Sequence, residues 1–195
     1  GYKVYSKTGN YEVLRKENSK KKVLITYATY GSGHKTVANY LANYLINHSD
    51  YEVKVIDLMD YENLIGLISK KVFEQNFKFR TSSAIFSVLY ELFDFKTTTL
   101  PYKAATKAIF KNKALQEEII SFNPDLLIST HFFGNITLGM LNRKKLTNTK
   151  IISIITDYKS HEMWEKDVKS IDALIVSNDI VKNDFHKPIG SKQHK

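Results

Sequence analysis

A turn that contains Gly31, Gly33 and His34 follows an apolar, β-branched run from Val23 to Ala28 and opens a predicted helix. Because glycine has no side chain, the backbone of such a turn approaches a ligand closely, and the helix N-terminus offers unpaired N–H groups and a partial positive charge. We therefore expect an anionic or hydroxylic ligand above this turn. The same positive charge disfavours the cationic form of a histidine in the first helical turn. A neutral imidazole beside a bound hydroxyl is what a general base requires, so His34 is the candidate catalytic base.

Two other interpretations of this turn stay open. The dinucleotide-binding fingerprint G-x-G-x-x-G also places glycines after a strand, with an acid about 20 residues further on. Here Thr36 occupies the third glycine position, and the acid, Asp57, follows Gly31 by 26 positions. A nucleotide-binding Rossmann enzyme is therefore the weaker alternative. The other is that His34 is a helix-capping or core histidine without chemistry.

The elements that must position this turn are typical of an α/β protein. Alternating apolar runs and helical patterns imply right-handed crossovers, and they predict a doubly wound, mostly parallel Rossmann-like sheet. The expected strands lie at 23–28, 53–57, 125–130, 151–156 and 172–177, and the expected helical stretches at 34–47, 62–122, about 134–143 and 179–185. We expect residues 1–20 to form a leader or small hairpin, residues 21–185 the Rossmann-like domain, and residues 186–195 a tail.

Polar side chains follow three of these strands at the point where each ends. The turn with His34 follows the first strand, Ser129, Thr130 and His131 follow the third, and Thr156, Asp157 and Tyr158 follow the fourth, with His161 and Trp164 shortly after. In parallel sheets ligands bind beyond the carboxyl ends of the strands, so these side chains are expected to share one crevice.

Each of these residues also has a simpler interpretation. Asp157 is suited to be the N-cap of a helix at 159–166, and Met163 and Trp164 are suited to plain packing. A zinc site made by His34, His131 and Asp157 lacks the paired histidines of a metal-binding helix, so we predict no metal.

The composition excludes several other classes of function. The absence of cysteine rules out disulfides, thiolate metal sites and a cysteine nucleophile. The net charge of +9 comes almost entirely from lysine, whereas proteins that read nucleic acid usually rely on arginine for bidentate contacts. We therefore expect no nucleic-acid partner. No signal peptide and no apolar run of about 18 residues is present, so the chain is expected to be soluble or peripheral.

The long helical insertion between the second and third strands, 62–122, is much longer than a crossover needs. Within residues 66–113 there are nine basic and three acidic side chains, interleaved with large aromatics. This mixture suits the headgroup zone of an anionic bilayer, although the aromatics are equally suited to packing on the sheet. The expected membrane contacts are Lys70, Lys71, Phe77, Arg80, Lys103, Lys107 and Lys111.

Three segments together resemble a known enzyme family. They are Ile25-Thr-Tyr-Ala-Thr-Tyr-Gly-Ser-Gly-His34, Thr130-His131-Phe132 and Ile155-Thr-Asp-Tyr-x-x-His161-x-x-Trp164. Over roughly residues 22–185 the chain is similar to the monogalactosyldiacylglycerol synthases and processive diacylglycerol glucosyltransferases. That group is related to the peptidoglycan N-acetylglucosaminyltransferase that makes lipid II. The resemblance implies the N-terminal, acceptor-binding half of a GT-B glycosyltransferase, whose second Rossmann-like domain binds a UDP-sugar.

The resemblance also implies roles for individual residues. His34 matches the proposed base on the acceptor hydroxyl, Gly31 and Gly33 match the loop near the reacting groups, and Asp157, His161 and Trp164 match the motif on the acceptor side. With Asp157 as a second catalytic residue and His131 as an acceptor contact, the expected reaction moves a hexose from a UDP-sugar to diacylglycerol, without a cofactor.

The expected location is the cytoplasmic face of the cell membrane, as a peripheral protein. The donor domain of the family is absent from this chain, so the chain alone is expected to be inactive, and a non-catalytic membrane- or lipid-binding module stays an alternative.

Overall fold

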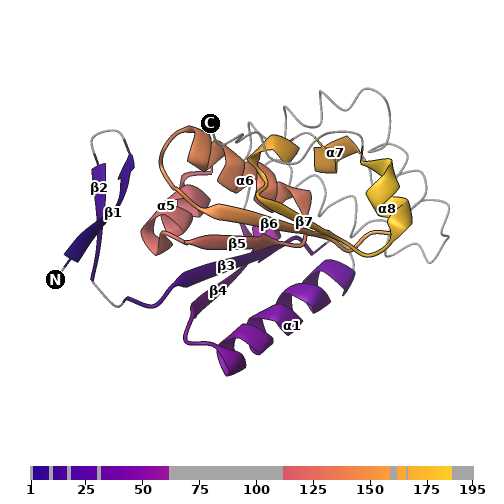
Figure 1. Cartoon of the computed structure of the whole chain (residues 1–195), viewed down its shortest axis with the longest axis horizontal. Helices are drawn as coiled ribbons and strands as arrows, with labels where there is room; N and C mark the ends of the chain where they lie inside the picture. The colour runs from indigo at the N-terminus through magenta and orange to yellow at the C-terminus, as the bar shows by residue number, and fades with distance from the viewer. Residues whose placement is uncertain are drawn as a thin grey trace.

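The structure is a computed structural model built around one parallel β-sheet (Figure 1). It describes residues 2–8, 11–16, 19–29, 32–61, 112–158, 162–165 and 167–185. Five strands lie in the order β4-β3-β5-β6-β7, and every neighbouring pair in this sheet is parallel. Their bounds are β3 Lys22–Tyr27, β4 Glu52–Asp57, β5 Leu126–Ser129, β6 Lys150–Ile155 and β7 Ala173–Val176.

The helices cover the two faces of the sheet unequally. Helix α1, Ser32–His48, packs through Ala38 and Ala42 against Val23 and Ile25 in a small core on one face. The larger core contains side chains from the other α-helices that the structure describes, including the fully buried Trp164. Those helices are α5 Lys113–Phe122, α6 Phe132–Arg143, α7 Glu162–Glu165 and α8 Asp179–Asp184. The doubly wound α/β fold predicted from the sequence is confirmed, with each predicted strand found to within one residue at either end.

The strand order reverses direction between β3 and β5. From β3 the chain passes through α1 to β4 on one side, and then returns across β3 to place β5 on its other side. In doubly wound sheets, ligands bind beyond the carboxyl ends of the strands at such a switch point. His34, in the first turn of α1, follows β3, and His131 follows β5, so the topology brings these two candidate residues together.

Short polar side chains determine where several helices begin. The side chains of Asn112 and Asn178 accept hydrogen bonds from the backbone N–H groups of Leu115 and Val181, and so cap α5 and α8. Helix α5 ends at Phe122, and the next residue, Asn123, caps it: its backbone is left-handed and its N–H donates to the carbonyl of Ile119. Two 3₁₀ turns, η1 Leu58–Asp60 and η2 Val168–Ser170, complete the described elements of the domain.

Close packing of α6 on the sheet depends on Gly134. A Cβ atom added there would lie 2.1 Å from Ser129 Oγ and 2.2 Å from Thr26 Oγ1, far inside van der Waals contact. Because glycine alone avoids this overlap, the first turn of α6 comes close to the ends of β3 and β5. The sequence interpretation had assigned no role to this glycine.

The N-terminal residues form a separate antiparallel hairpin, β1 Tyr2–Thr8 with β2 Tyr11–Lys16. In Figure 1 the hairpin stands beside the end of the sheet where the strands begin. Of the predicted helical insertion at 62–122, the structure describes α5 and the residues next to it, and most of the insertion lies outside the described residues, as does the tail 186–195. Within the described parts of the chain, no helix is both long and apolar enough to cross a membrane.

Candidate functional site

His34 lies in the first turn of α1, at the carboxyl ends of the strands, and is 8% exposed. Its Nδ1 atom is 2.6 Å from the backbone carbonyl oxygen of Thr130 and 2.8 Å from Thr156 Oγ1. Three separate segments, those after β3, β5 and β6, therefore meet at one imidazole. The buried ring is held on its Nδ1 side, which directs Nε2 the other way.

Asp157 stands on the Nε2 side of the same ring. Its Oδ1 atom is 3.8 Å from His34 Nε2, and its Oδ2 atom accepts a hydrogen bond of 3.0 Å from the indole Nε1 of Trp164. A carboxylate at this distance stabilises positive charge that develops on the imidazole. His34 and Asp157 thus form a pair that is able to take a proton from a hydroxyl group.

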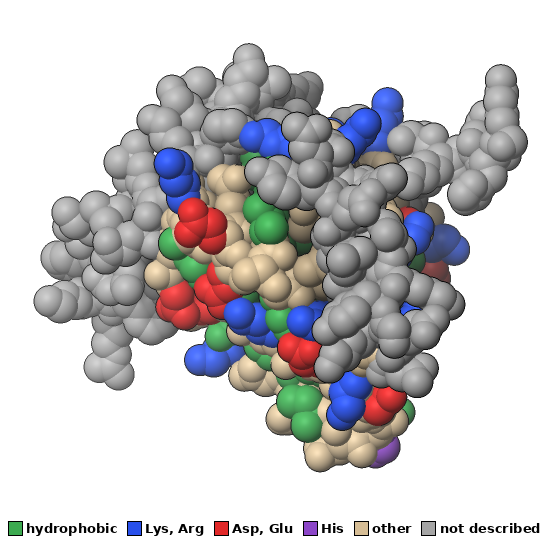
Figure 2. Space-filling view, turned by 90° about the vertical axis from the view of Figure 1, so that its left-hand side faces the viewer, with side chains coloured by type: hydrophobic (Ala, Val, Ile, Leu, Met, Phe, Trp, Pro, Cys, Tyr) green, Lys and Arg blue, Asp and Glu red, His purple; other side chains and the backbone are tan. Residues whose placement is uncertain are grey.

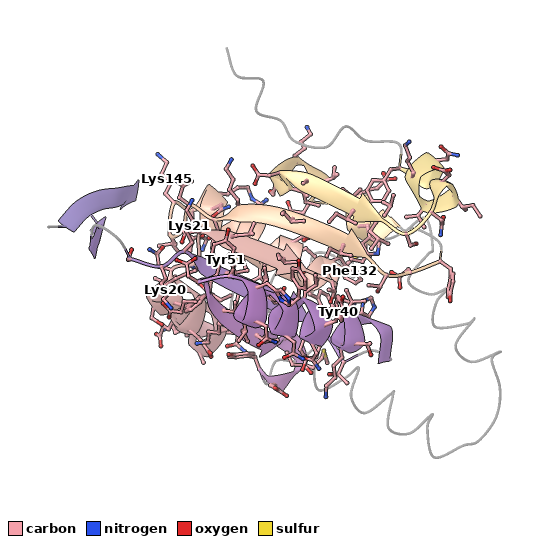
Figure 3. All side chains as sticks on the ribbon, turned by 60° about the horizontal axis from the view of Figure 1, so that its bottom comes forward. Lys20, Lys21, Tyr40, Tyr51, Phe132 and Lys145 are labelled. Carbon is pink, nitrogen blue, oxygen red and sulfur yellow. The ribbon has the colours of Figure 1, made fainter. Side chains whose placement is uncertain are left out.

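His131 lies next to this pair. The ring centroids of His34 and His131 are 5.0 Å apart in an edge-to-face arrangement. The Nδ1 atom of His131 accepts a hydrogen bond from the backbone N–H of Phe133, so His131 is the N-cap of α6, and its ring packs on Phe132 and Phe133. Figure 3 shows Phe132 at the opposite end of the sheet from Lys20, Lys21 and Lys145.

A buried hydrogen-bond network holds the loop between β5 and α6. Thr26 Oγ1 donates to Ser129 Oγ, which in turn donates to the carbonyl of His131 at 2.6 Å. The Thr130 backbone N–H donates to the carbonyl of Thr26, and the Thr130 hydroxyl donates to the carbonyl of His34. Because Thr26, Ser129 and Thr130 are fully buried, these bonds are shielded from water and hold the Thr130 carbonyl in place beside His34.

The structure changes the interpretation of the residues that follow β6. Helix α7 spans Glu162–Glu165, and the Asp157 carboxylate accepts a hydrogen bond from the Trp164 side chain. Residues 159–161, on which the N-cap interpretation of Asp157 depends, lie outside the described residues. Trp164 is 1% exposed and Met163 is 2% exposed, as the packing interpretation of these two residues requires. Trp164 therefore contacts the site through its hydrogen bond to Asp157, and its predicted role on the acceptor surface stays a prediction.

Of the other predicted site residues, the structure describes Gly33 but not Gly31 or His161. Gly33 is exposed, and a Cβ atom added there would meet nothing within 4 Å, so the fold itself does not require a glycine at this position. Gly31 and His161 lie outside the described residues, as do the predicted membrane contacts Lys70, Lys71, Phe77, Arg80, Lys103, Lys107 and Lys111.

Asp57, the acid that the dinucleotide interpretation needs, is engaged within the chain. Its carboxylate accepts hydrogen bonds from the backbone N–H of Met59 and from the N–H and hydroxyl of Thr29. It therefore ties the loop after β3 to the end of β4. Burial, with a contribution from the Asp57 and Asp60 carboxylates, raises the pKa of Tyr27 in the same corner. Among the described residues, no cluster of three or more His, Cys, Asp or Glu side chains is arranged to hold a metal ion.

Thr130 and Thr156 follow two of the predicted strands, but the sequence predicts no role for either residue. Their contacts with His34 span 96 and 122 positions of the chain. A signal was available, because both threonines directly follow buried strands that were expected to end at the site. The sequence does not show which polar atoms at the ends of these strands contact the imidazole of His34.

Comparisons with known proteins give a consistent result. Residues 34–195 match the family model described as monogalactosyldiacylglycerol (MGDG) synthase. Among curated proteins, the chain is similar to the processive diacylglycerol beta-glucosyltransferases of Bacillus subtilis (27% identical) and Bacillus pumilus (28% identical), each over 85% of this chain and 41% of the relative. The Staphylococcus carnosus protein of the same name is 27% identical over 74% of this chain and 35% of the relative.

The chain thus spans about two fifths of the length of the curated relatives it matches. No solved structure is a significant match to it.

Proposed function

Because the chain belongs to the monogalactosyldiacylglycerol synthase family, we propose that it forms the acceptor-binding domain of a glycosyltransferase that makes membrane glycolipid. The proposed reaction transfers a hexose from a UDP-sugar to the free hydroxyl of diacylglycerol. The relatives named above support this acceptor, and the site supports the chemistry. The observation that carries the proposal is the buried His34, held through Nδ1 at the switch point of the sheet with Asp157 beside Nε2.

In the proposed mechanism His34 is the general base. The acceptor hydroxyl gives its proton to Nε2 of the neutral imidazole while its oxygen attacks the anomeric carbon of the sugar. The bond from that carbon to the UDP oxygen breaks, so the configuration at the carbon is inverted. The Asp157 carboxylate, 3.8 Å from Nε2, stabilises the imidazolium that forms.

The donor and the membrane complete this proposal. UDP-sugar would be bound mainly by a donor domain outside this chain, and no further cofactor takes part. The protein would act as a peripheral protein on the cytoplasmic face of an anionic membrane, since its acceptor is a lipid. The excess of lysine and aromatic residues in 66–113 supports this docking, with no nucleic acid as partner.

The experiment that tests the proposal compares the chain with and without a donor domain. The first sample is the chain alone, and the second is a hybrid in which the chain replaces the matching part of the Bacillus subtilis relative. Both are incubated with UDP-glucose or UDP-galactose and diacylglycerol vesicles. We expect glycolipid from the hybrid and none above background from the chain, because a site assembled from two halves needs both.

Three results would count against the proposal. Turnover at an ordinary enzymatic rate by the chain alone would contradict the two-domain mechanism. A folded hybrid that binds diacylglycerol vesicles but never transfers sugar would favour the lipid-binding module. Tight binding of NAD or ATP to the chain would favour the nucleotide-binding enzyme.

A further inference from the structure

The position of the proton on the neutral His34 ring follows from what surrounds its two nitrogens. A neutral imidazole carries one N–H, on either Nδ1 or Nε2, and the other nitrogen then presents a lone pair. The Thr130 backbone carbonyl, 2.6 Å from Nδ1, accepts hydrogen bonds and has no proton to donate. A bare Nδ1 would therefore place two lone pairs against each other at this short distance, in a site that is buried from water.

The Asp157 carboxylate favours the opposite tautomer, with the proton on Nε2. Asp157 Oδ1, 3.8 Å from Nε2, attracts an N–H on that nitrogen. If the proton moved there, Nε2 would become a donor and would no longer accept the proton of a hydroxyl group. The activity of His34 as a base thus depends on which side of the ring holds the proton more strongly.

The Thr156 hydroxyl is placed where it influences this balance. Its oxygen is 2.8 Å from Nδ1, so it provides a second acceptor beside the carbonyl of Thr130. Thr156 and Asp157 are adjacent at the end of β6, and they approach the two opposite nitrogens of one ring. Two adjacent residues therefore act on opposite sides of the ring. Thr156 favours a proton on Nδ1, which keeps Nε2 bare, and Asp157 stabilises the ring once Nε2 is protonated.

We propose that Thr156 is a positioning residue: with the Thr130 carbonyl, its hydroxyl keeps the proton of neutral His34 on Nδ1 and leaves Nε2 to meet the acceptor hydroxyl. This proposal rests on the proposed function only for what Nε2 then does. The state of the ring itself is a property of this chain. Thr130 contributes through its backbone, so Thr156 is the partner that a substitution is able to remove.

The test is ¹⁵N NMR of the whole chain with ¹⁵N-labelled histidine, in buffer alkaline enough that imidazoles are neutral. His34→Gln identifies the His34 signals. We expect a protonated-type shift for Nδ1 and a bare-type shift for Nε2 in the parent chain. In Thr156→Val, which keeps the shape but loses the hydroxyl, we expect the ratio of the two tautomers to move toward Nε2–H by about 2-fold to 10-fold, the size of one hydrogen bond.

Thr156→Ser is the matched control, because it keeps the hydroxyl and should restore the parent ratio. If the Thr156 hydroxyl instead donates to a bare Nδ1, the parent ring will carry its proton on Nε2, and Thr156→Val will move the ratio in the opposite direction. Either that result or an unchanged ratio in Thr156→Val would overturn the proposal. Should the valine variant unfold, Thr156→Ala removes the same hydroxyl and takes its place. A proton on Nε2 in the parent chain, or an unchanged ratio in Thr156→Ala, overturns the proposal.

Sugar transfer by the hybrid enzyme is measured separately, so that the two proposals fail in different ways. We expect Thr156→Val to lower kcat in proportion to the fraction of His34 that keeps Nε2 bare, with the KM for diacylglycerol unchanged and Thr156→Ser near the parent value. Because that fraction changes less than the tautomer ratio when the parent ring is mainly Nδ1–H, the fall in kcat is calculated from the ratios that NMR measures. If the NMR result is as expected but His34→Ala keeps full turnover, the general-base function is wrong and the ring assignment stands. If turnover needs His34 but the ring carries its proton on Nε2, the positioning role is wrong.

Discussion

In the proposed mechanism His34 is the base, and Asp157 supplies the negative charge that stabilises the protonated imidazole. The imidazole is 8% exposed and is held by oxygens from two other loops, so little reorganisation is needed when it accepts a proton. The carboxylate is itself oriented by the buried Trp164 indole. Preorganised groups of this kind stabilise charge that develops in a transition state.

Replacement of His34 by alanine should therefore affect catalysis far more than donor binding. In the hybrid enzyme we expect His34→Ala to lower kcat about 10²- to 10⁴-fold, the usual contribution of a positioned general base. The measurement is steady-state transfer, with the KM for the UDP-sugar near the parent value because the proposed mechanism places the histidine against the acceptor.

Asp157→Asn is the informative companion of this variant. An asparagine oxygen still accepts from Trp164 Nε1, so the melting temperature should change little while kcat falls, because the supporting charge is gone. A His34→Ala enzyme with nearly full kcat and a normal melting curve would move the base assignment to Asp157.

At the scale of elements, two glycines near the site differ in whether packing leaves room for a side chain. Gly134 lies where the first turn of α6 crosses the ends of β3 and β5, and no Cβ fits there. Gly33 lies in the first turn of α1, with open space around the position of a Cβ. Packing within the chain requires the glycine at 134, whereas no packing contact requires the glycine at 33.

We expect the two alanine variants to separate stability from binding. Gly134→Ala should lower the free energy of unfolding by about 1–3 kcal/mol, as overpacking does, whereas Gly33→Ala should leave denaturant unfolding nearly unchanged. In a vesicle assay, Gly33→Ala should weaken retention of diacylglycerol if the backbone there approaches the acceptor. Equal unfolding midpoints for the two variants would contradict the packing explanation.

A third element-scale feature is the carboxylate of Asp167 beside α6. It is 7% exposed, Arg143 donates to its Oδ1 at 2.6 Å, and its Oδ2 atom is buried without a hydrogen-bond partner. Burial raises the pKa of Asp167 above its ordinary value of 3.8, and the hydrogen bond and charge of Arg143 oppose that shift only in part. The folded state thus binds this proton more readily than the unfolded state does.

The sign of the resulting pH dependence follows from linkage. The contribution of Asp167 to stability is fully present below the unfolded-state pKa and is lost as the pH rises through the higher folded-state pKa. Urea unfolding as a function of pH, upward from about the ordinary carboxyl value, measures this. Asp167→Asn should have a flatter profile than the parent, and the difference between the two profiles removes the contribution of other groups such as Asp125, whose pKa burial also raises.

For the whole molecule, the described surface does not account for the net charge of +9. On the face in Figure 2, where the strands begin, basic and acidic side chains are mixed. Several charged side chains of the described residues are paired, including Lys54 with Glu118 at 2.7 Å and Lys150 with Asp172 at 2.8 Å. Much of the excess positive charge belongs to residues 66–113, which the sequence interpretation assigned to membrane contact.

Binding of the chain to vesicles should accordingly depend on anionic lipid and on salt. Each lysine near an anionic surface contributes about 1 kcal/mol, and salt screens charges separated by more than a Debye length. In flotation assays we expect charge reversal of Lys103, Lys107 and Lys111 together to weaken binding, and charge reversal of Lys20, Lys21 and Lys145 to leave it nearly unchanged. Equal recovery with neutral and anionic vesicles would show that the assignment of 66–113 is wrong.

Much of this organisation was readable from the order of residues. Apolar runs bounded by polar residues identified all five strands of the main sheet, because a strand buried on both faces must be almost continuously hydrophobic. Since the strands are parallel, the residues after β3, β5 and β6 were expected to meet, and His34, His131 and Asp157 do lie together. Most of the insertion 62–122 lies outside the described residues, so its interpretation stays a prediction.

Only the tertiary structure shows which atoms of those residues contact one another. The carbonyl of Thr130 is a backbone atom common to every residue type, so nothing in the sequence marked it as the partner of His34. Burial of Trp164 and the close approach at Gly134 likewise depend on how α7 and α6 pack on the sheet. Periodicity and composition report which element a residue belongs to and which edge it reaches, whereas hydrogen-bond partners depend on distances of a few tenths of an ångström between segments far apart in the chain.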